Sequence, residues 1–292
     1  MARNVRRSAA IPSLAAAVVV LAAGAACALP AAPQAPPPAA TPAAPAPAPD
    51  PAAWARLVPR PELPRDRPLR VGVLVVDGVD DGELAAPLAV LREVGRHVEG
   101  PGVELVTVSP DGAAVTSAAG LRIAAERSFA DAPAVDVLVV PGAHGAFRRD
   151  GAEPVVIEWL RRNGSGARWV VALGGGTFAA ARAGLLDRLA ATTFPGDYDE
   201  LAARFPAVDL RVNVSFVHDG PALTSQGGAR SFDVAFYLVD HLWGEAAARG
   251  VAAALGVDWP PDPHGHPRFV VVPRPATDPD APPVLEATGE AP

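Results

Sequence analysis

The chain has 292 residues, of which 50% are hydrophobic, enough for one sizeable core and too few for a second large domain. Its formal net charge is −7 and its basic residues are all Arg, so we expect no concentrated cationic face and no nucleic-acid partner. The single Cys excludes an internal disulfide and a Cys-based metal cluster.

Residues 1–27 have the pattern of an export signal. Three arginines among the first seven residues precede an apolar run at 11–21 that is short for a transmembrane helix. The stretch that ends at Cys27 resembles a bacterial lipobox, but Ala26-Cys27-Ala28 also fits ordinary signal cleavage. We favour lipidation of Cys27 and a periplasmic or cell-envelope location. Secretion and a retained membrane anchor are the alternatives.

Residues 28–67 are rich in Ala and Pro, a composition that cannot bury enough apolar surface to fold. We expect a semi-rigid linker there and a Pro-rich tail at 260–292. The tail contains a short apolar run at 269–272 that is predicted to add an edge strand. Its two histidines, His264 and His266, are too few for a metal site, so neither a metal nor another cofactor is expected.

Between these flanks, residues 68–259 alternate short β-branched runs with helical periodicity, as one folded domain would. Strands are predicted at 69–76, 103–108, 135–140, 169–173 and 211–217. Helices are predicted at 82–97, 154–162, 177–186 and 229–241. Continuous apolar strands separated by helices are typical of an α/β, doubly wound and mostly parallel sheet with helices on both faces. Ligands of such folds bind beyond the carboxyl ends of the strands.

Two Gly-rich turns follow predicted strands, one at Gly142-Ala143-His144 and one at Gly174-Gly175-Gly176-Thr177. Backbone N–H groups in such turns are suited to binding an anion or stabilising an oxyanion. The structural alternative, which is the commoner case, is that the glycines only permit positive φ and close packing.

Several short motifs occur in a fixed order along the domain. They are V-G-V-L-V-V-D-G at 71–78, E-L-A-A-P-L at 83–88, V-L-V-V-P-G at 137–142, A-G-L-L-D at 183–187, A-T-T at 191–193, H-D-G at 218–220 and T-S-Q-G-G at 224–228. As a set they resemble the ThiJ/PfpI family, also called the DJ-one/PfpI family, of the class I glutamine amidotransferase-like superfamily. The resemblance is closest to isonitrile-hydratase-like members and to the ligand domains of AraC-type regulators.

This resemblance implies a flavodoxin-like fold, usually dimeric, with a reactive Cys at a nucleophile elbow, an acidic side chain from the first helix and often a nearby His. Matched by position, the acid is Glu83, the elbow is Gly174 and the His position is Phe194. The nucleophile and the commonest base are therefore both missing. We conclude that cysteine-dependent protease, glyoxalase, deglycase or hydratase activity is excluded.

Glu83 is the main candidate for a role in the site. A buried carboxylate facing a pocket has a raised pKa and is able to act as a general base. The alternative, which we favour, is that Glu83 has no catalytic role and is simply hydrogen-bonded to the glycine-rich turn. The predicted ligand-binding set is Glu83, Gly142, Ala143, His144, Gly174, Gly175 and Thr177, with Ser225 and Arg230 nearby.

Two members of this set have simpler interpretations. His144 is suited to proton donation if it faces the crevice, but an exposed loop His is the simpler case. Thr177 offers a hydroxyl near the elbow, although a hydroxyl at a helix start more often caps backbone N–H groups.

Three functions remain open. The favoured one is a non-catalytic, exported domain that binds a small ligand or a partner protein. The second is a hydrolase or hydratase that uses Glu83 without a covalent thiol intermediate. The third is a structural role, in which the surface of an expected homodimer matters more than the pocket.

Overall fold

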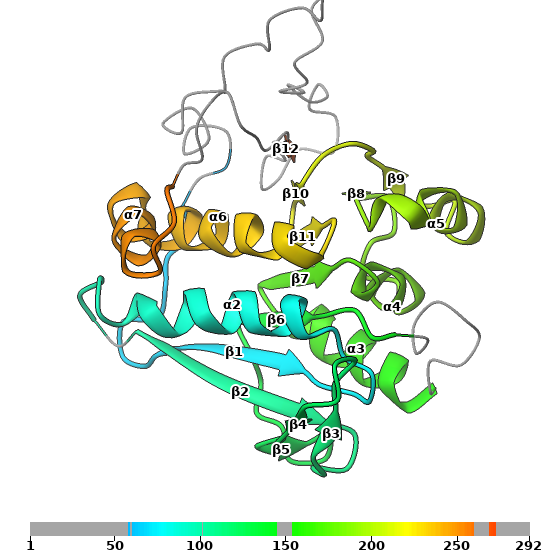
Figure 1. Cartoon of the computed structure of the whole chain (residues 1–292), viewed down its shortest axis with the longest axis horizontal. Coiled ribbons are helices and arrows are strands. Elements are labelled where there is room, and N and C mark those ends of the chain that lie inside the picture. Colours follow the sequence, from blue (N-terminus) through cyan, green and yellow to red (C-terminus); the bar gives the residue numbers. More distant parts are fainter. Residues whose placement is uncertain (1–57, 59, 101, 145–153, 260–268, 273–292) are drawn as a thin grey trace, which may run out of the picture. The chain divides into compact units, whose positions relative to one another are not determined.

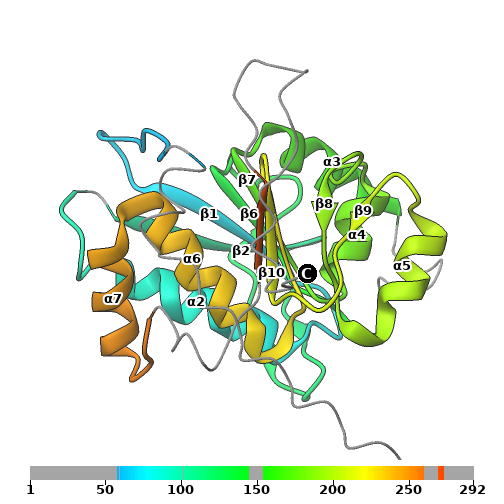
Figure 2. The same ribbon diagram turned by 90° about the horizontal axis from the view of Figure 1, so that it is seen from above.

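The computed structural model describes residues 58, 60–100, 102–144, 154–259 and 269–272. The predicted signal, the lipidation site Cys27, most of the linker, and His264 and His266 lie outside the described residues. Within the described part, one large sheet stands between two layers of helices (Figures 1 and 2).

The large sheet has eight strands in the order β12-β10-β11-β7-β6-β1-β2-β5. Their bounds are β1 Leu69–Leu74, β2 Val103–Ser109, β5 Arg127–Ser128, β6 Val137–Val140, β7 Trp169–Leu173, β10 Phe216–Asp219, β11 Ala222–Ser225 and β12 Phe269–Val272. Neighbouring strands are parallel except β10 and β11, which are antiparallel. The predicted α/β, doubly wound and mostly parallel sheet is confirmed, and β12 is the edge strand expected at 269–272.

The helices cover both faces of the sheet, as predicted. One layer holds α2 (Asp81–Val94), α6 (Ser231–Trp243) and α7 (Glu245–Ala254), and the other holds α3 (Pro154–Gly166), α4 (Gly176–Arg182) and α5 (Tyr198–Arg204) (Figure 2). Successive residues of a strand point to opposite faces of the sheet, and each face packs against one helix layer in its own hydrophobic core. In β6, Val137 and Val139 belong to one core, and Leu138 and Val140 belong to the other. In the part of the chain that the structure covers, no helix has the length and apolar character needed to cross a membrane.

Some predicted bounds are wrong. The strand expected at 211–217 begins only at Phe216, because Asn213 adopts a left-handed conformation (φ 58°) that interrupts an extended chain. The helix expected at 177–186 ends at Arg182, and Gly184 follows with φ 76°. The helix expected at 82–97 ends at Val94, and α3 extends beyond residue 162 to Gly166.

Several elements were not predicted. They are β11, α5, α7, the short strand pairs β3 (Val115–Thr116) with β4 (Arg122–Ile123) and β8 (Ala190–Ala191) with β9 (Asp209–Leu210), the edge strand β5, and the single 3₁₀ turns η1 (Pro195–Asp197) and η2 (Gly228–Arg230). Of these, β11 matters most. It lies between β7 and β10, and its carboxyl end brings the loop at residues 226–228 beside the turn that follows β7.

Two histidines and a tyrosine form a buried cluster between β10 and α6. The Tyr237 hydroxyl lies 2.8 Å from His218 Nδ1, and His218 Nε2 lies 3.1 Å from the Gly220 carbonyl oxygen. Because a carbonyl only accepts, Nε2 carries the proton and the hydroxyl donates to Nδ1. The His241 ring stacks on Tyr237. Burial lowers the pKa of His218 to about 4, with a further contribution from His241, and burial together with Arg60 lowers the pKa of His241 to about 4.

We predict that the domain loses stability as the pH falls from 6.5 toward 4. In that range the unfolded chain takes up protons on His218 and His241 while the folded chain does not, so the free energy of unfolding must fall with pH. His241→Phe keeps an aromatic ring against Tyr237 and removes one titrating group. Between pH 6.5 and pH 4, the free energy of unfolding should fall less for this variant than for the parent protein. The difference between the two falls should be at most about 3 kcal/mol.

Urea unfolding at a series of pH values measures this effect. The exposed His97 provides a matched control, His97→Phe, which should leave most of the pH dependence in place. Burial raises the pKa of Glu83 and of Asp240, so these two carboxyls change stability in the opposite direction and are common to all three proteins. A pH dependence that is the same in His241→Phe as in the parent would contradict the prediction.

Candidate functional site

Gly174 lies directly after β7, at the turn into α4. Its φ is +44°, a left-handed conformation that residues with a side chain rarely adopt. Its N–H donates to the Ser225 carbonyl at 2.9 Å, and its carbonyl accepts from the Thr177 N–H at 3.1 Å and from the Thr193 hydroxyl at 2.8 Å. The turn therefore has the sharp strand-to-helix form of a nucleophile elbow, with a hydrogen atom where the side chain would begin.

Glu83 reaches this turn from the first turn of α2. Asp80 caps that helix, because its Oδ1 accepts a hydrogen bond from the Glu83 N–H at 3.0 Å. The Glu83 residue is only 6% exposed. Its Oε2 accepts from the Gly142 N–H at 2.6 Å, and its Oε1 accepts from the Gly228 N–H at 3.3 Å. Loops that follow β6 and β11 thus bond the same carboxyl group.

Three glycines enclose this carboxyl group, and we call Gly142, Gly174 and Gly227 the glycine cage. An ideal Cβ built on any of the three would lie under 3.0 Å from a Glu83 carboxyl oxygen, closer than real Cβ atoms approach. A Cβ on Gly227 would also lie 2.8 Å from the Gly174 Cα. The Glu83 carboxyl group therefore occupies the space in which an elbow side chain would start.

The other two glycines of the triplet at the elbow differ from Gly174. A Cβ on Gly176 would collide with the Val140 carbonyl oxygen, so this residue is required for close packing. Gly175 has an ordinary φ of −62°, and the nearest atom to its Cβ would be the Gly142 Cα at 3.6 Å. Positive φ and close packing thus account for two of the three glycines without any ligand.

Burial raises the pKa of Glu83 above its ordinary value, and the negative charge of Asp80 acts in the same direction. The N–H groups of Gly142 and Gly228 and the charge of His144 oppose this rise. A carboxyl group with a raised pKa is suited to proton transfer near neutral pH. The glycine cage, however, leaves little of it in contact with solvent.

The remaining predicted residues have other partners. His144 is exposed, and its N–H donates to the Gly78 carbonyl at 2.7 Å. Ala143 is buried and forms a β-bridge with Val79. Thr177 is fully buried and its hydroxyl donates to the Thr192 carbonyl at 3.0 Å, so it does not cap α4. The structure thus brings together Glu83 and the glycines of the predicted set, while these three residues bond elsewhere.

Three contributors were missed from the sequence: Thr193, which bonds the elbow carbonyl, and Gly227 and Gly228. All three stand in the A-T-T and T-S-Q-G-G motifs, which were the only signal available. Ser225 and Arg230 contribute to the same loop, because the Ser225 hydroxyl donates to the Arg230 carbonyl at 3.2 Å.

Phe194, at the position of the expected His, is 53% exposed. Within the residues that the structure covers, no three His, Cys, Asp or Glu side chains are grouped to hold a metal ion.

The chain is similar in sequence and in fold to known proteins. Residues 69–241 match the sequence model of the DJ-1/PfpI family. Isonitrile hydratase of Pseudomonas putida is 30% identical over 187 residues, which is 64% of this chain and 78% of that protein. The HTH-type transcriptional regulator GbdR of Pseudomonas aeruginosa is 30% identical over 66% of this chain, which spans 51% of the regulator. Drosophila melanogaster DJ-1beta has a TM-score of 0.57 at 23% identity, covers 66% of this chain and 100% of its own, and supports the fold alone.

We predict that Gly174→Ala destabilises the domain by at least about 2 kcal/mol, because it combines a left-handed backbone with a collision against Glu83. The matched control is Gly175→Ala, for which an ordinary φ and a 3.6 Å clearance predict a change below about 1 kcal/mol. Chemical denaturation measures both variants.

A double-mutant cycle tests the cause of this loss. Glu83→Ala removes the atoms that the new Cβ would meet, so Gly174→Ala should cost less stability in the Glu83→Ala background than in the parent. Equal losses for Gly174→Ala and Gly175→Ala, or no coupling with Glu83, would show that the carboxyl group does not fill the elbow.

Proposed function

We propose that this chain, which belongs to the DJ-1/PfpI family, is a non-catalytic member that binds a small ligand or a partner protein. The glycine cage around Glu83 carries the proposal. The elbow has no side chain, and the carboxyl group of Glu83 fills the space for one. The only Cys of the chain, Cys27, lies in the predicted export signal, 147 positions before Gly174 in the sequence. Members of this family that depend on an elbow Cys therefore differ from this chain in their chemistry.

The binding surface that we infer is the rim outside the cage. His144 and Phe194 are exposed, and a Cβ built on Gly228 would have nothing within 4 Å. Each of the three lies within two residues of a group that bonds Glu83 or Gly174. The ring of Phe194 offers apolar contact to a ligand. The imidazole of His144 and the solvent-facing backbone of Gly228 offer hydrogen bonds.

A second candidate function is hydrolysis or hydration with Glu83 as the general base and no covalent intermediate. The raised pKa of a carboxyl group at the elbow favours it. Its low exposure and its enclosure by bare backbone oppose it, since a substrate would have to open the cage to reach either oxygen. We therefore place it second.

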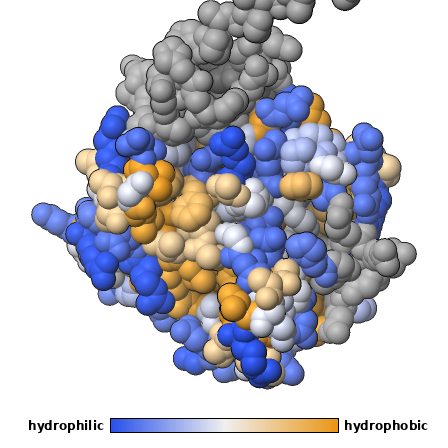
Figure 3. Space-filling model, in the orientation of Figure 1, coloured by the Kyte–Doolittle hydropathy of each residue, from blue (hydrophilic) through white to orange (hydrophobic). Residues whose placement is uncertain are grey.

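The third candidate is a structural role as a homodimer. Figure 3 shows apolar side chains gathered over the face formed by α2, α6 and α7, where Leu88 and Phe232 are half-buried. Contiguous apolar surface of this kind is typical of interaction sites. We infer that a second copy of the chain covers this face, and light scattering on the purified protein tests the inference.

We predict that a screen of metabolites, dicarbonyls and isonitriles finds a ligand that raises the melting temperature without being consumed. At a hundredfold excess over Kd, binding stabilises the folded state by about 2.7 kcal/mol. For a domain of this size that is a shift of about 5 to 10 °C. Differential scanning fluorimetry detects the shift, and product analysis of each positive compound detects turnover.

Glu83→Gln separates the first two candidates. Turnover by the parent that disappears in Glu83→Gln would replace our proposal with the hydrolase or hydratase. Binding without turnover supports it. A blank screen from a protein that is dimeric by light scattering would favour the structural role.

We also propose that the domain acts outside the cytoplasm, attached to a membrane through a lipid on Cys27. The proposal rests on the early arginines, the short apolar run and the lipobox-like stretch. We predict that Cys27→Ser moves the protein from the membrane fraction to the soluble fraction. Mass spectrometry of the mature amino terminus measures the same change directly. Parent protein that is cleaved and carries no lipid would contradict lipidation and support secretion.

A further inference from the structure

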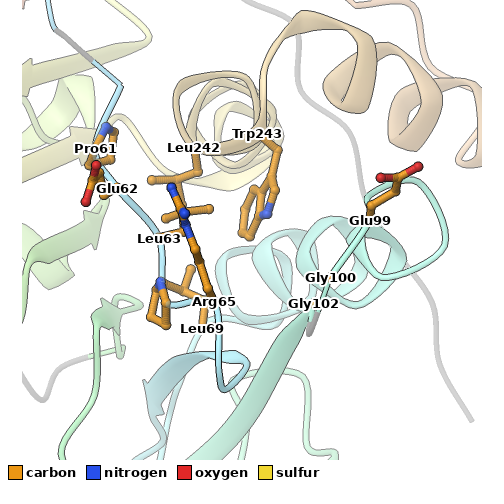
Figure 4. Close-up of a pocket in the computed structure, with 11 residues that line it drawn as sticks. Pro61, Glu62, Leu63, Arg65, Leu69, Glu99, Gly100, Gly102, Leu242 and Trp243 are labelled. Carbon is orange, nitrogen blue, oxygen red and sulfur yellow. The ribbon is translucent and has the colours of Figure 1, made fainter.

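A groove lies at the end of the sheet opposite to the glycine cage, beside the amino ends of β1 and β2 (Figure 4). Its volume is about 470 Å³, which is within the range of small-molecule sites. Its apolar walls come from three separate parts of the chain: Leu63 on the segment that precedes β1, Leu69 at the start of β1, and Leu242 and Trp243 at the end of α6.

The segment that forms one wall, residues 60–67, is held at both ends. Arg67 makes two hydrogen bonds to Asp136, at 2.6 and 2.8 Å, in the bidentate arrangement that Arg and carboxylates favour. At the other end, Arg60 lies 3.9 Å from Asp240 on α6. The side chains between these two anchors are therefore presented to the groove from a fixed piece of backbone.

Arg65 differs from the other two arginines of this segment. No carboxylate of the described chain lies within 4.0 Å of its guanidinium, whereas Arg60 and Arg67 each have one. In Figure 4 its side chain extends along the groove toward Leu242, with Trp243 beside it, while Glu62 and Glu99 stand at the margins. A guanidinium has a planar set of donors that matches a carboxylate.

We propose that this groove binds a small organic acid with an apolar, aromatic body. The carboxylate of the ligand pairs with Arg65, and its ring packs against Leu242 and Trp243. A purely hydrophilic anion such as phosphate would gain nothing from these walls, and a neutral aromatic compound would leave Arg65 unpaired. This site shares no residue with the rim of the glycine cage. The proposal for the groove therefore does not depend on the function proposed for the rim.

Isothermal titration calorimetry of the full chain with two matched probes tests the proposal. The probes are 2-naphthoate and the neutral 2-naphthalenemethanol, which share a ring system and differ in charge. We expect the acid to bind about tenfold more tightly than the alcohol, as one charge-assisted pair on a partly exposed surface would give. No measurable binding of the acid, or equal affinity for the two probes, would overturn the proposal.

Variants assign the effect to the groove. Arg65→Gln should remove the difference between the two probes, and Trp243→Ala should weaken both. The matched control is Arg122→Gln, since Arg122 is also exposed and has no carboxylate within 4.0 Å in the described chain, but lies on β4 away from the groove. A preference for the acid that survives Arg65→Gln, or that is lost in Arg122→Gln, would overturn the proposal. Unchanged melting temperatures show that each variant is folded.

Discussion

One buried carboxyl group determines how the loops at the carboxyl end of the sheet are built. A carboxylate loses its hydration when it is buried, so it needs hydrogen-bond donors in place of water. For Glu83 these donors are backbone N–H groups of Gly142 and Gly228. Backbone approaches a side chain this closely only where no Cβ intervenes, and the cage positions are glycines for that reason. The absent side chain at Gly174 and the buried Glu83 are therefore two sides of one packing arrangement.

The order of the strands in the sheet brings these loops together. Because β11, β7, β6 and β1 are consecutive neighbours, the loops that follow them lie side by side at one edge of the sheet. The loop after β1 leads into α2, whose cap at Asp80 fixes the position of Glu83. Glu83, the third residue of α2, thus meets three loops that are far apart in the sequence. Binding surfaces in doubly wound folds occur at this edge for the same topological reason.

The sequence predicted what depends on local pattern. Strand β7 was predicted with its observed bounds, because an unbroken apolar run is ended by three glycines. Strand β11 was missed, since four residues that include Thr224 and Ser225 carry no strand signal until β7 and β10 pair with them. The elbow and its acid were found from motifs, but the part played by Gly227 was not, because it arises from a distance across the fold. The groove at Arg65 was invisible for the same reason.

The two ends of the sheet differ in whether their charged side chain is buried or exposed. At the carboxyl end a charged group is turned inward and enclosed, so the surface left there is His144, Phe194 and open backbone. At the amino end Arg65 stays unpaired beside apolar walls, on a segment that composition alone assigned to a linker. That segment enters the fold across the amino end, where Arg67 bonds Asp136. Under the attachment that we propose, the rim therefore lies at the opposite end of the sheet from the point where this segment enters the fold, and the groove lies beside that point.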